Sequence, residues 1–190
     1  MVDAGAAPAY DRRDMHGLIF AALRGYLEEA GGTDVAWEAL GERMYVIHES
    51  HPDELLMESL ERACTLLDME PDALLEDFGV FTGRKVFPRL FPMIYSPHVS
   101  ASSFLPIVDE QIHSIVRKAV PSALTPGLAV HREDGGVMVA YTSGRMLCVY
   151  LRGLLAGTAG HFGETATLEE QTCMRRGDPV CLFRVQLSPR

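Results

Sequence analysis

The spacing of apolar residues changes about two thirds of the way along the chain, and this change constrains the fold more than any other feature. Through about residue 120, apolar side chains recur three and four residues apart, which places them along one face of an α-helix. Beyond residue 126 they alternate with polar residues in short runs separated by turns rich in Gly and Asp, which is typical of antiparallel strands. Helices followed by an antiparallel sheet predict an α+β fold.

The pattern predicts the bounds of the individual elements. Helices are expected over 16–32, 34–44, 51–69, 70–81, 100–120 and, between the strands, 145–162. Strands are expected over 127–134, 136–143, 165–174 and 179–187. Residues 1–14 show no period and are predicted to be a flexible extension. Residues 15–190 then form a single domain, with a helical lobe over about 15–100 and an α+β lobe over about 101–190.

The charge balance excludes several kinds of partner. The chain has 26 acidic and 17 basic residues and a formal net charge of -9, whereas nucleic acids and anionic membrane surfaces bind basic faces. There is no run of about eighteen apolar residues and no signal peptide, so we expect a cytoplasmic protein without a membrane span. The four cysteines are then expected to be reduced thiols or metal ligands rather than disulfides.

One of the seven histidines, His113, differs from the others in its surroundings. It lies in the middle of the most regular predicted helix, close to Ile112 and Ile115, whereas the others lie beside turns or at helix ends. A histidine in such a place is either a core residue with a hydrogen-bond partner or a metal ligand. Without further information the core role is favoured.

A second candidate is the segment Tyr141-Thr142-Ser143-Gly144-Arg145, at the junction of a predicted strand and a predicted helix. Side chains two residues apart on a strand share a face, so Tyr141, Ser143 and Arg145 can point in one direction. Two hydroxyls and a guanidinium suit a carboxylate, which arginine can bind through two parallel hydrogen bonds. The alternative is a helix cap by Ser143 beside a surface arginine.

These two features occur in an order that resembles the heme–nitric oxide/oxygen binding (H-NOX) family. Domains of this family hold the heme propionates with a Tyr-x-Ser-x-Arg motif, which implies this role for Tyr141, Ser143 and Arg145. The segment IHSIVRKAVPSALTP resembles the family's proximal helix. This likeness implies that His113 is the axial ligand of the heme iron and that Pro126 packs against the heme.

The resemblance covers nearly the whole chain, from about residue 15 to residue 187. The segments MHGLIF and FGVFTGRKVFPRLFP resemble the first helix and the middle of the family's domains, and the second segment is one residue longer here. Val120 stands where the family has an aromatic residue before Pro121. Two further apolar residues are implied to contact the heme, Ile19 and Leu154.

The resemblance also bears on the gas that is bound. Tyr150 follows Arg145 at the spacing of a distal tyrosine that, in oxygen-binding members, donates a hydrogen bond to oxygen. Such a donor stabilises oxygen selectively, whereas nitric oxide needs little help. Leu23 stands where those members have a supporting tryptophan, which favours nitric oxide. The alternative for Tyr150 is a boundary tyrosine with its hydroxyl in water.

Cys173 and Cys181 flank the turn RRGDP and can meet if the two flanking strands pair. Some bacterial H-NOX proteins hold a zinc ion with a cysteine pair at this spacing and two other residues, whose places fall here near Cys148 and Glu170. Thiolates and carboxylates are both competent zinc ligands. The alternatives are small core residues on neighbouring strands or a disulfide formed by oxidation.

A sensor rather than an enzyme is expected, because the chain has no GxSxG, HExxH or P-loop motif. The resemblance implies heme b as cofactor and nitric oxide, oxygen or CO as ligand. It also implies signalling in trans to a histidine kinase or a cyclic-di-GMP enzyme, since the chain ends soon after the last predicted strand. The competing hypothesis is a heme-free zinc or thiol redox sensor on the same fold, which uses Cys148, Cys173 and Cys181.

Overall fold

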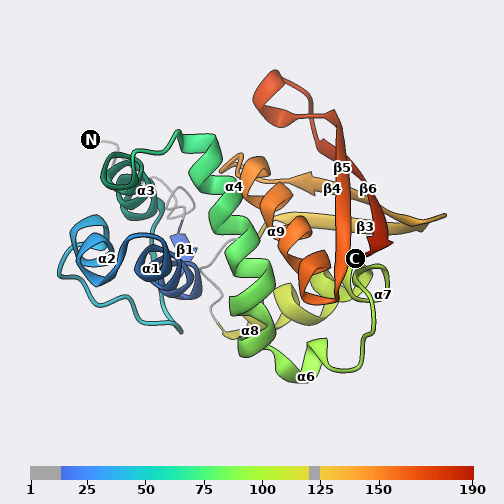
Figure 1. The fold of residues 1–190 in the computed structure, drawn as a ribbon, viewed down its shortest axis with the longest axis horizontal. Helices are drawn as coiled ribbons and strands as arrows, with labels where there is room; N and C mark the ends of the chain where they lie inside the picture. Colours follow the sequence, from blue (N-terminus) through green and yellow to red (C-terminus); the bar gives the residue numbers. More distant parts are fainter. Residues whose placement is uncertain (1–13, 120–124) are drawn as a thin grey trace, which may run out of the picture.

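The computed structural model describes residues 14–119 and 125–190. Helices form its first part and a four-stranded antiparallel sheet forms its second (Figure 1), so the predicted α+β fold is confirmed. The predicted N-terminal extension lies outside the described residues except for Asp14. Val120 and Pro121, where the sequence departs from the family pattern, also lie outside them.

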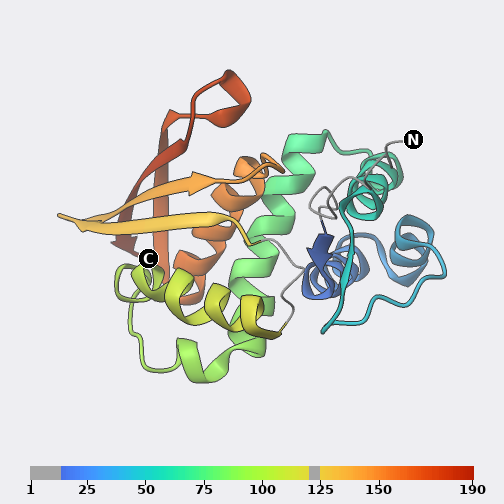
Figure 2. The same cartoon turned by 180° about the vertical axis from the view of Figure 1, so that it is seen from behind.

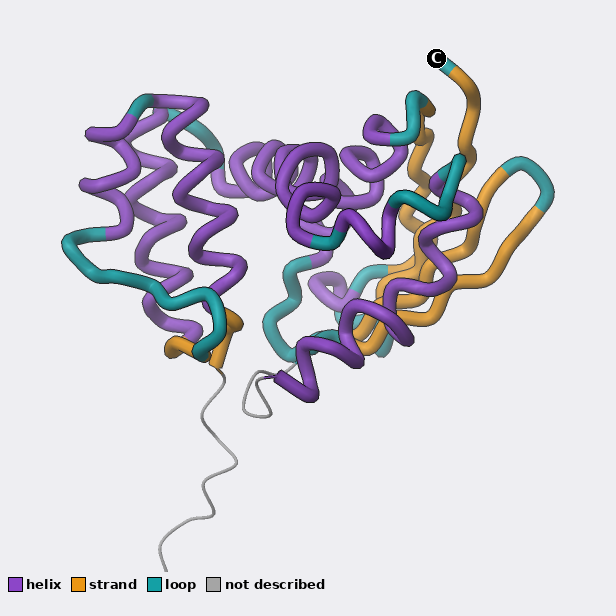
Figure 3. Tube along the Cα trace, turned by 90° about the horizontal axis from the view of Figure 1, so that it is seen from below, coloured by secondary structure: helices purple, strands orange, loops and turns teal. Residues whose placement is uncertain are grey.

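Three helices pack together at the beginning of the described chain: α1 (Gly17–Gly31), α2 (Thr33–Leu40) and α3 (Asp53–Leu67). His16 caps α1, because its Nδ1 accepts a hydrogen bond from the Leu18 N–H at 3.1 Å. Two short strands, β1 (Asp14–His16) and β2 (Ser50–Pro52), pair antiparallel at one end of these helices (Figure 3). Strands this short show no alternation, so the sequence analysis did not predict them.

The helix α4 (Pro71–Phe81) lies between α1–α3 and the sheet (Figures 1 and 3). Proline suits its first position, because the N–H that proline lacks would have no partner there. The chain continues from α4 into a π-helical turn, η2 (Thr82–Val86), and then into α5 (Phe87–Leu90) and α6 (Pro92–Tyr95).

The helix predicted over 100–120 is in fact a succession of helical pieces. They are α7 (Ala101–Phe104), the 3-10 turn η3 (Leu105–Ile107), the π-helical turn η4 (Asp109–His113) and α8 (Ser114–Ala119). Pro106 lacks an N–H, which explains why α-helical geometry stops near it. The prediction of one regular helix was therefore wrong, and His113 lies at the end of a π turn.

The sheet has the strand order β3-β4-β6-β5, and every neighbouring pair is antiparallel (Figure 2). Its strands are β3 (Gly127–Glu133), β4 (Gly136–Thr142), β5 (Glu164–Thr172) and β6 (Cys181–Pro189), with a 3-10 turn, η5 (Met174–Arg176), between the last two. The helix α9 (Cys148–His161) packs between the sheet and α4. It begins later than predicted, because Met146 adopts a left-handed φ of 51° that interrupts a helix.

The backbones of α4 and α9 touch. Gly79 of α4 and Gly83 of η2 face α9, and Gly153 and Gly157 of α9 face α4, so that a Cβ atom on Gly153 would lie 2.0 Å from the Glu76 carbonyl oxygen. Any side chain at these four positions would push the helices apart. This contact joins the helical part of the molecule to the part that carries the sheet.

Two apolar cores stabilise the fold. One lies among α1–α4 and includes Leu23, Leu27 and Phe78, and the other lies between α9 and the sheet and includes Val139 and Phe183. None of the described helices is both long and apolar enough to cross a membrane.

Candidate functional site

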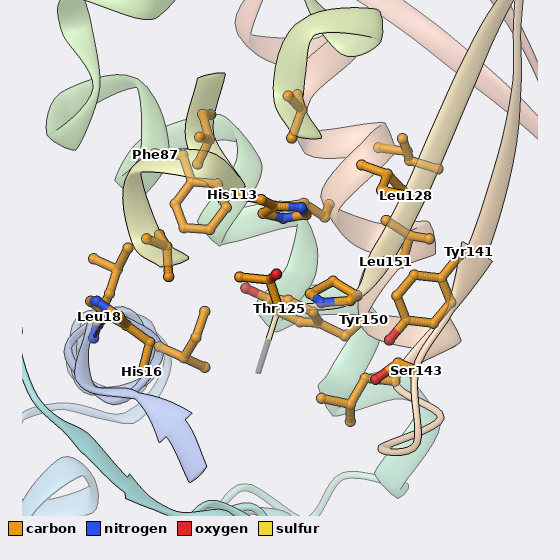
Figure 4. A pocket seen from close by; sticks show the side chains of 18 of the residues that line it. His16, Leu18, Phe87, His113, Thr125, Leu128, Tyr141, Ser143, Tyr150 and Leu151 are labelled. Atoms are coloured by element: carbon orange, nitrogen blue, oxygen red, sulfur yellow. Dashed lines mark hydrogen bonds between the residues drawn. The ribbon is translucent and has the colours of Figure 1, made fainter. Parts of the chain in front are cut away.

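A cavity lies where α1, α4, α9, β4 and the helical pieces between residues 87 and 116 meet (Figure 4). Its walls are mainly leucine, isoleucine, valine and phenylalanine side chains. The polar groups that reach it include His113, Tyr141, Ser143, Arg145 and Tyr150. The structure thus brings together two motifs that the sequence analysis singled out independently, from η4 and from the end of β4.

His113 faces the cavity from the last residue of η4 (Figure 4). Its Nδ1 lies 2.9 Å from Asp109 Oδ1, and Arg117 Nη1 lies 3.4 Å from the same oxygen. Burial lowers the pKa of His113 below its usual value, and this effect exceeds the opposing effect of Asp109. The imidazole is therefore neutral near pH 7, and a carboxylate at Nδ1 assigns the ring proton there and leaves the Nε2 lone pair for a metal ion.

The segment Tyr141–Arg145 lies at the edge of the cavity. Tyr141 is buried, and its hydroxyl interacts with that of Ser143. Burial raises the pKa of Tyr141, so it is a neutral hydrogen-bond donor. Ser143 Oγ accepts a hydrogen bond from the Arg145 N–H at 3.2 Å, which fixes the turn that follows β4.

The Arg145 side chain points inward and bridges the two parts of the molecule. Its Nε donates to Asp53 Oδ2 at 2.7 Å, and its Nη2 donates to the Asp14 carbonyl oxygen at 2.8 Å. Asp53 begins α3, so this ion pair ties the first helices to the end of β4. The guanidinium is thereby held at the edge of the cavity rather than in solvent.

Tyr150 lies on α9, and its ring packs against that of Phe78 at 4.8 Å between centroids. Its hydroxyl is buried and makes no hydrogen bond within the described part of the chain. Burial raises the pKa of Tyr150, and the Thr82 hydroxyl partly opposes this effect.

Of the other residues singled out from the sequence, Ile19, Leu154 and Pro126 line the cavity. Leu23 does not, since it is fully buried in the core of the first helices.

These residues fit a heme group. An apolar cavity suits the macrocycle, the neutral imidazole of His113 suits the iron, and hydroxyls with a guanidinium at the edge suit the propionates. His16 also lines the cavity, but its Nδ1 accepts the hydrogen bond from the Leu18 N–H. The Tyr150 hydroxyl is a buried polar atom whose partner is missing among the described residues, as expected where a further group belongs.

A second site lies where α9 begins, close to η5. One ligand atom from each of four side chains comes within 4.8 Å of every other, and the four residues are Cys148, Glu170, Cys173 and Cys181. The Sγ atoms of Cys148 and Cys173 are 3.6 Å apart. Burial, together with the neighbouring thiols, raises the pKa of Cys148 to about 12. Without a metal ion this thiol is therefore protonated at neutral pH.

Three residues of these sites were missed in the sequence. Asp109 precedes His113 by one helical turn, and this spacing could have identified it. Asp53 is far from Arg145 in the sequence and carries no local signal. Thr82 lies in a segment whose helical pattern hides the π turn.

Comparisons with known proteins identify the family. The family model described as Haem-NO-binding matches residues 16–170. A comparison with curated proteins finds no match. The solved structures that are similar include an H-NOX protein from Shewanella oneidensis in the Fe(II)NO state, with a TM-score of 0.82 and 24% identity over 92% of this chain and 99% of that one.

Two further structures show the same fold. An oxygen-binding H-NOX domain related to soluble guanylate cyclases, solved as its oxygen complex, has a TM-score of 0.80 and 22% identity over 92% of this chain and 96% of that one. An unliganded Fe(II) H-NOX protein from K. algicida has a TM-score of 0.75 and 19% identity over 93% and 98%. Because the family model spans most of the sequence, this chain belongs to the heme–nitric oxide binding (H-NOX) family of heme-based gas-sensing domains.

Proposed function

We propose that this chain senses nitric oxide through a heme b group held in the cavity by His113. The observation that carries this proposal is the position of His113, a neutral imidazole aligned by Asp109 on the wall of an apolar cavity. The hydroxyls of Tyr141 and Ser143 and the guanidinium of Arg145 would bind the propionates. When bound, heme supplies an iron centre with one open coordination position for a diatomic gas.

The chain's own residues would control access to this position. Leu154, Ile19 and Pro126 line the cavity and would pack against the macrocycle, excluding water. Nitric oxide needs little help from polar groups, so walls that are mainly apolar suit it, whereas oxygen would depend on Tyr150. The family model described as Haem-NO-binding supports nitric oxide, whereas the similar solved structures include complexes with nitric oxide, with CO and with oxygen and do not distinguish among the gases.

Signalling would begin at His113, since this residue joins the π turn η4 to α8. A change in the bond between His113 and the iron would shift this segment, which carries the exposed Ile115 and Arg117. A partner would read this surface in trans, and we propose a histidine kinase or a cyclic-di-GMP enzyme in the cytoplasm. The lobes over about 15–100 and about 101–190 would act as one domain around the cavity.

The visible spectrum of the purified protein tests this proposal. His113→Ala should lose the heme absorption band and regain it when free imidazole is supplied, because the cavity and the propionate clamp remain. His131→Ala, on the exposed face of β3, is the matched control and should keep the parent spectrum. A His113→Ala protein that retains the parent's ferrous spectrum without imidazole would exclude His113 as the ligand.

We also propose a zinc ion bound by Cys148, Glu170, Cys173 and Cys181. The approach of all four ligand atoms to within 4.8 Å supports a tetrahedral site. The Met174 N–H lies 3.2 Å from Cys181 Sγ, and such a donor stabilises a thiolate. Glu170 also pairs with Arg176 at 2.8 Å, so metal binding would exchange this ion pair for a metal bond.

Metal analysis of protein purified without chelator should give one zinc ion per chain. Cys173→Ser should lose the metal, whereas Cys64→Ser should keep it, because Cys64 lies on α3 away from the cluster. Protein that is metal-free but readily forms a bond between Cys148 and Cys173 under mild oxidation would favour the alternative, a thiol redox sensor, for which the 3.6 Å separation of their sulfurs is suited.

A further inference from the structure

The helical segment from η2 to α6 has one face toward the cavity and one toward solvent. The rings of Phe87 and Phe91 line the cavity and pack edge to face, with their centroids 6.0 Å apart. Between and after these rings, Arg89, Leu90 and Met93 are exposed. The helix α6 lies at the outer edge of the molecule (Figure 1). A molecule bound to the solvent face would therefore contact the helices that form the cavity wall.

Two long stretches of the sequence contain no Asp or Glu, although the chain has a formal net charge of -9. They cover residues 78–108 and 135–163, and they meet where η2 packs on α9. A Cβ atom on Gly83 would lie 2.4 Å from the Leu154 carbonyl oxygen, so the two backbones are in contact there. The surface around this contact consequently receives no acidic side chain from either stretch.

Three arginines gather near this contact without a counter-charge. A Cβ atom on Gly160, in the last turn of α9, would lie 3.6 Å from Arg84 Cδ and from Arg190 Nη2, and Arg89 follows Arg84 by about one turn of the helical path. All three arginines are exposed, and none forms an ion pair with a residue that the structure describes. Like charges repel one another, so an anionic group bound among them would relieve this repulsion.

We propose that the solvent face of η2, α5 and α6 is a docking surface for an acidic segment of the signalling partner. The surface is defined by Arg84, Arg89, Leu90 and Met93. Arginine and methionine are enriched in the cores of protein–protein interfaces, whereas lysine, aspartate and glutamate are depleted there, and this surface has that composition. The inference rests on the proposed function, because it takes the partner to act in trans and to read the gas site through the cavity wall.

A protein segment fits this surface better than a nucleic acid or an anionic membrane. Exposed Leu90 and Met93 provide apolar contact that phosphate groups do not use. An extended polyanion binds many cations at once and would also meet the acidic side chains elsewhere on this chain, whereas a short docked segment is screened from charges more than about 8 Å away. Pro88 and Pro92 lie in the first turns of α5 and α6 and restrict this backbone, so docking loses little conformational entropy.

An amphipathic peptide with one glutamate face and one leucine face is the probe for this surface. Its binding to the heme-loaded full chain is measured by fluorescence anisotropy, and the affinity should fall as the salt concentration rises. Arg84→Glu/Arg89→Glu should weaken binding about tenfold or more, because two attractive charges become repulsive. Met93→Ser should weaken it about fivefold through the loss of apolar contact.

Two variants are matched controls. Arg132→Glu reverses the charge of an exposed arginine on β3 that also lacks an ion pair within the described residues. Met44→Ser removes a methionine that is 88% exposed, against 82% for Met93. Both controls should bind the peptide as the parent does, because neither residue belongs to the docking surface.

The same titration on ferrous protein with and without nitric oxide tests whether the surface reads the gas site. Because coupling between two sites is reciprocal, the two affinities should differ. Equal affinities would overturn the role of this surface in signalling.

Three further results would overturn the docking proposal. They are the absence of peptide binding to the parent, an equal loss of affinity in Arg132→Glu and in Arg84→Glu/Arg89→Glu, and the binding of single-stranded DNA or phosphatidylserine vesicles, but not of the peptide, through Arg84 and Arg89. Failure of the proposed function is distinguishable, because the parent protein would then show no heme absorption band, whereas the peptide could still be titrated against it.

Discussion

Replacement of Arg145 by alanine should lower both stability and heme retention. The Nε atom of Arg145 lies 2.7 Å from Asp53 Oδ2, and the two side chains are only 11% and 14% exposed. The second oxygen of Asp53 has no hydrogen-bond partner within the described residues, so Arg145→Ala would leave a buried carboxylate without its counter-charge. Breaking a buried pair in this way typically costs about 3–5 kcal/mol, and we expect about 3 kcal/mol because some solvent reaches both side chains.

Chemical denaturation followed by circular dichroism, on samples with matched heme content, measures this loss. The double variant Asp53→Ala/Arg145→Ala should be more stable than Arg145→Ala alone, since it removes the unpaired charge as well. Heme transfer to an acceptor protein should be faster than in the parent for both variants, because retention depends on the guanidinium. A stability loss below about 1 kcal/mol, the value of a solvent-exposed pair, would refute the burial argument. Parent-like heme retention in the double variant would refute the propionate role.

Two further predictions concern packing and pH. Gly153→Ala should lower the free energy of unfolding by about 3 kcal/mol or more, because its Cβ would lie 2.0 Å from the Glu76 carbonyl oxygen. Gly25→Ala is its control and should be neutral or stabilising by up to about 1 kcal/mol, since the nearest atoms, in Phe81, are 3.6 Å away. Equal effects in urea denaturation would contradict this explanation. Burial and Asp77 raise the pKa of Tyr26 from 10.0 to about 12, so its contribution to stability should be complete below pH 10 and lost as the pH rises toward 12. Titration of tyrosinate absorbance should show late transitions from the buried tyrosines, and Tyr26→Phe should reduce their amplitude by one tyrosine. An unchanged profile in that variant would contradict the assignment.

The sequence predicted the strands better than the helices. The strand expected over 127–134 agrees closely with β3 (Gly127–Glu133). Its bounds were predictable because apolar and polar residues alternate along a strand, and this alternation stops abruptly at a turn. Over 100–120, by contrast, the bounds of the helical pieces could not be predicted. The spacing of apolar residues is nearly the same in 3-10, α and π turns, so the sequence pattern does not tell these turns apart, and only their backbone hydrogen bonds do. The segment FGVFTGRKVFPRLFP likewise contains a π turn, η2, that the sequence pattern does not reveal.

In the candidate site, residues that belong to a local sequence motif were predicted, whereas a partner distant in the sequence was not. His113 and the segment Tyr141–Arg145 were identified from their own motifs, and the structure places them on one cavity. The partner of Arg145 could not be identified, because Asp53 precedes it by 92 residues and an aspartate at the start of a helix has an ordinary local explanation. The cysteine cluster was inferred in two ways. The approach of Cys173 to Cys181 follows from the pairing of the strands on either side of their turn, whereas Cys148 and Glu170 were implied only by the resemblance to bacterial H-NOX proteins.

The glycine contact between α4 and α9 has a mechanical consequence. Elsewhere in a protein, side chains between two helices can change rotamers and absorb a small displacement. Here the four glycines leave no side chains between the backbones, so we expect α4 and the turn that follows it to move together with α9. Phe78 of α4 lines the cavity and Cys148 begins α9, so we predict that a displacement at the cavity changes the geometry of the cysteine cluster.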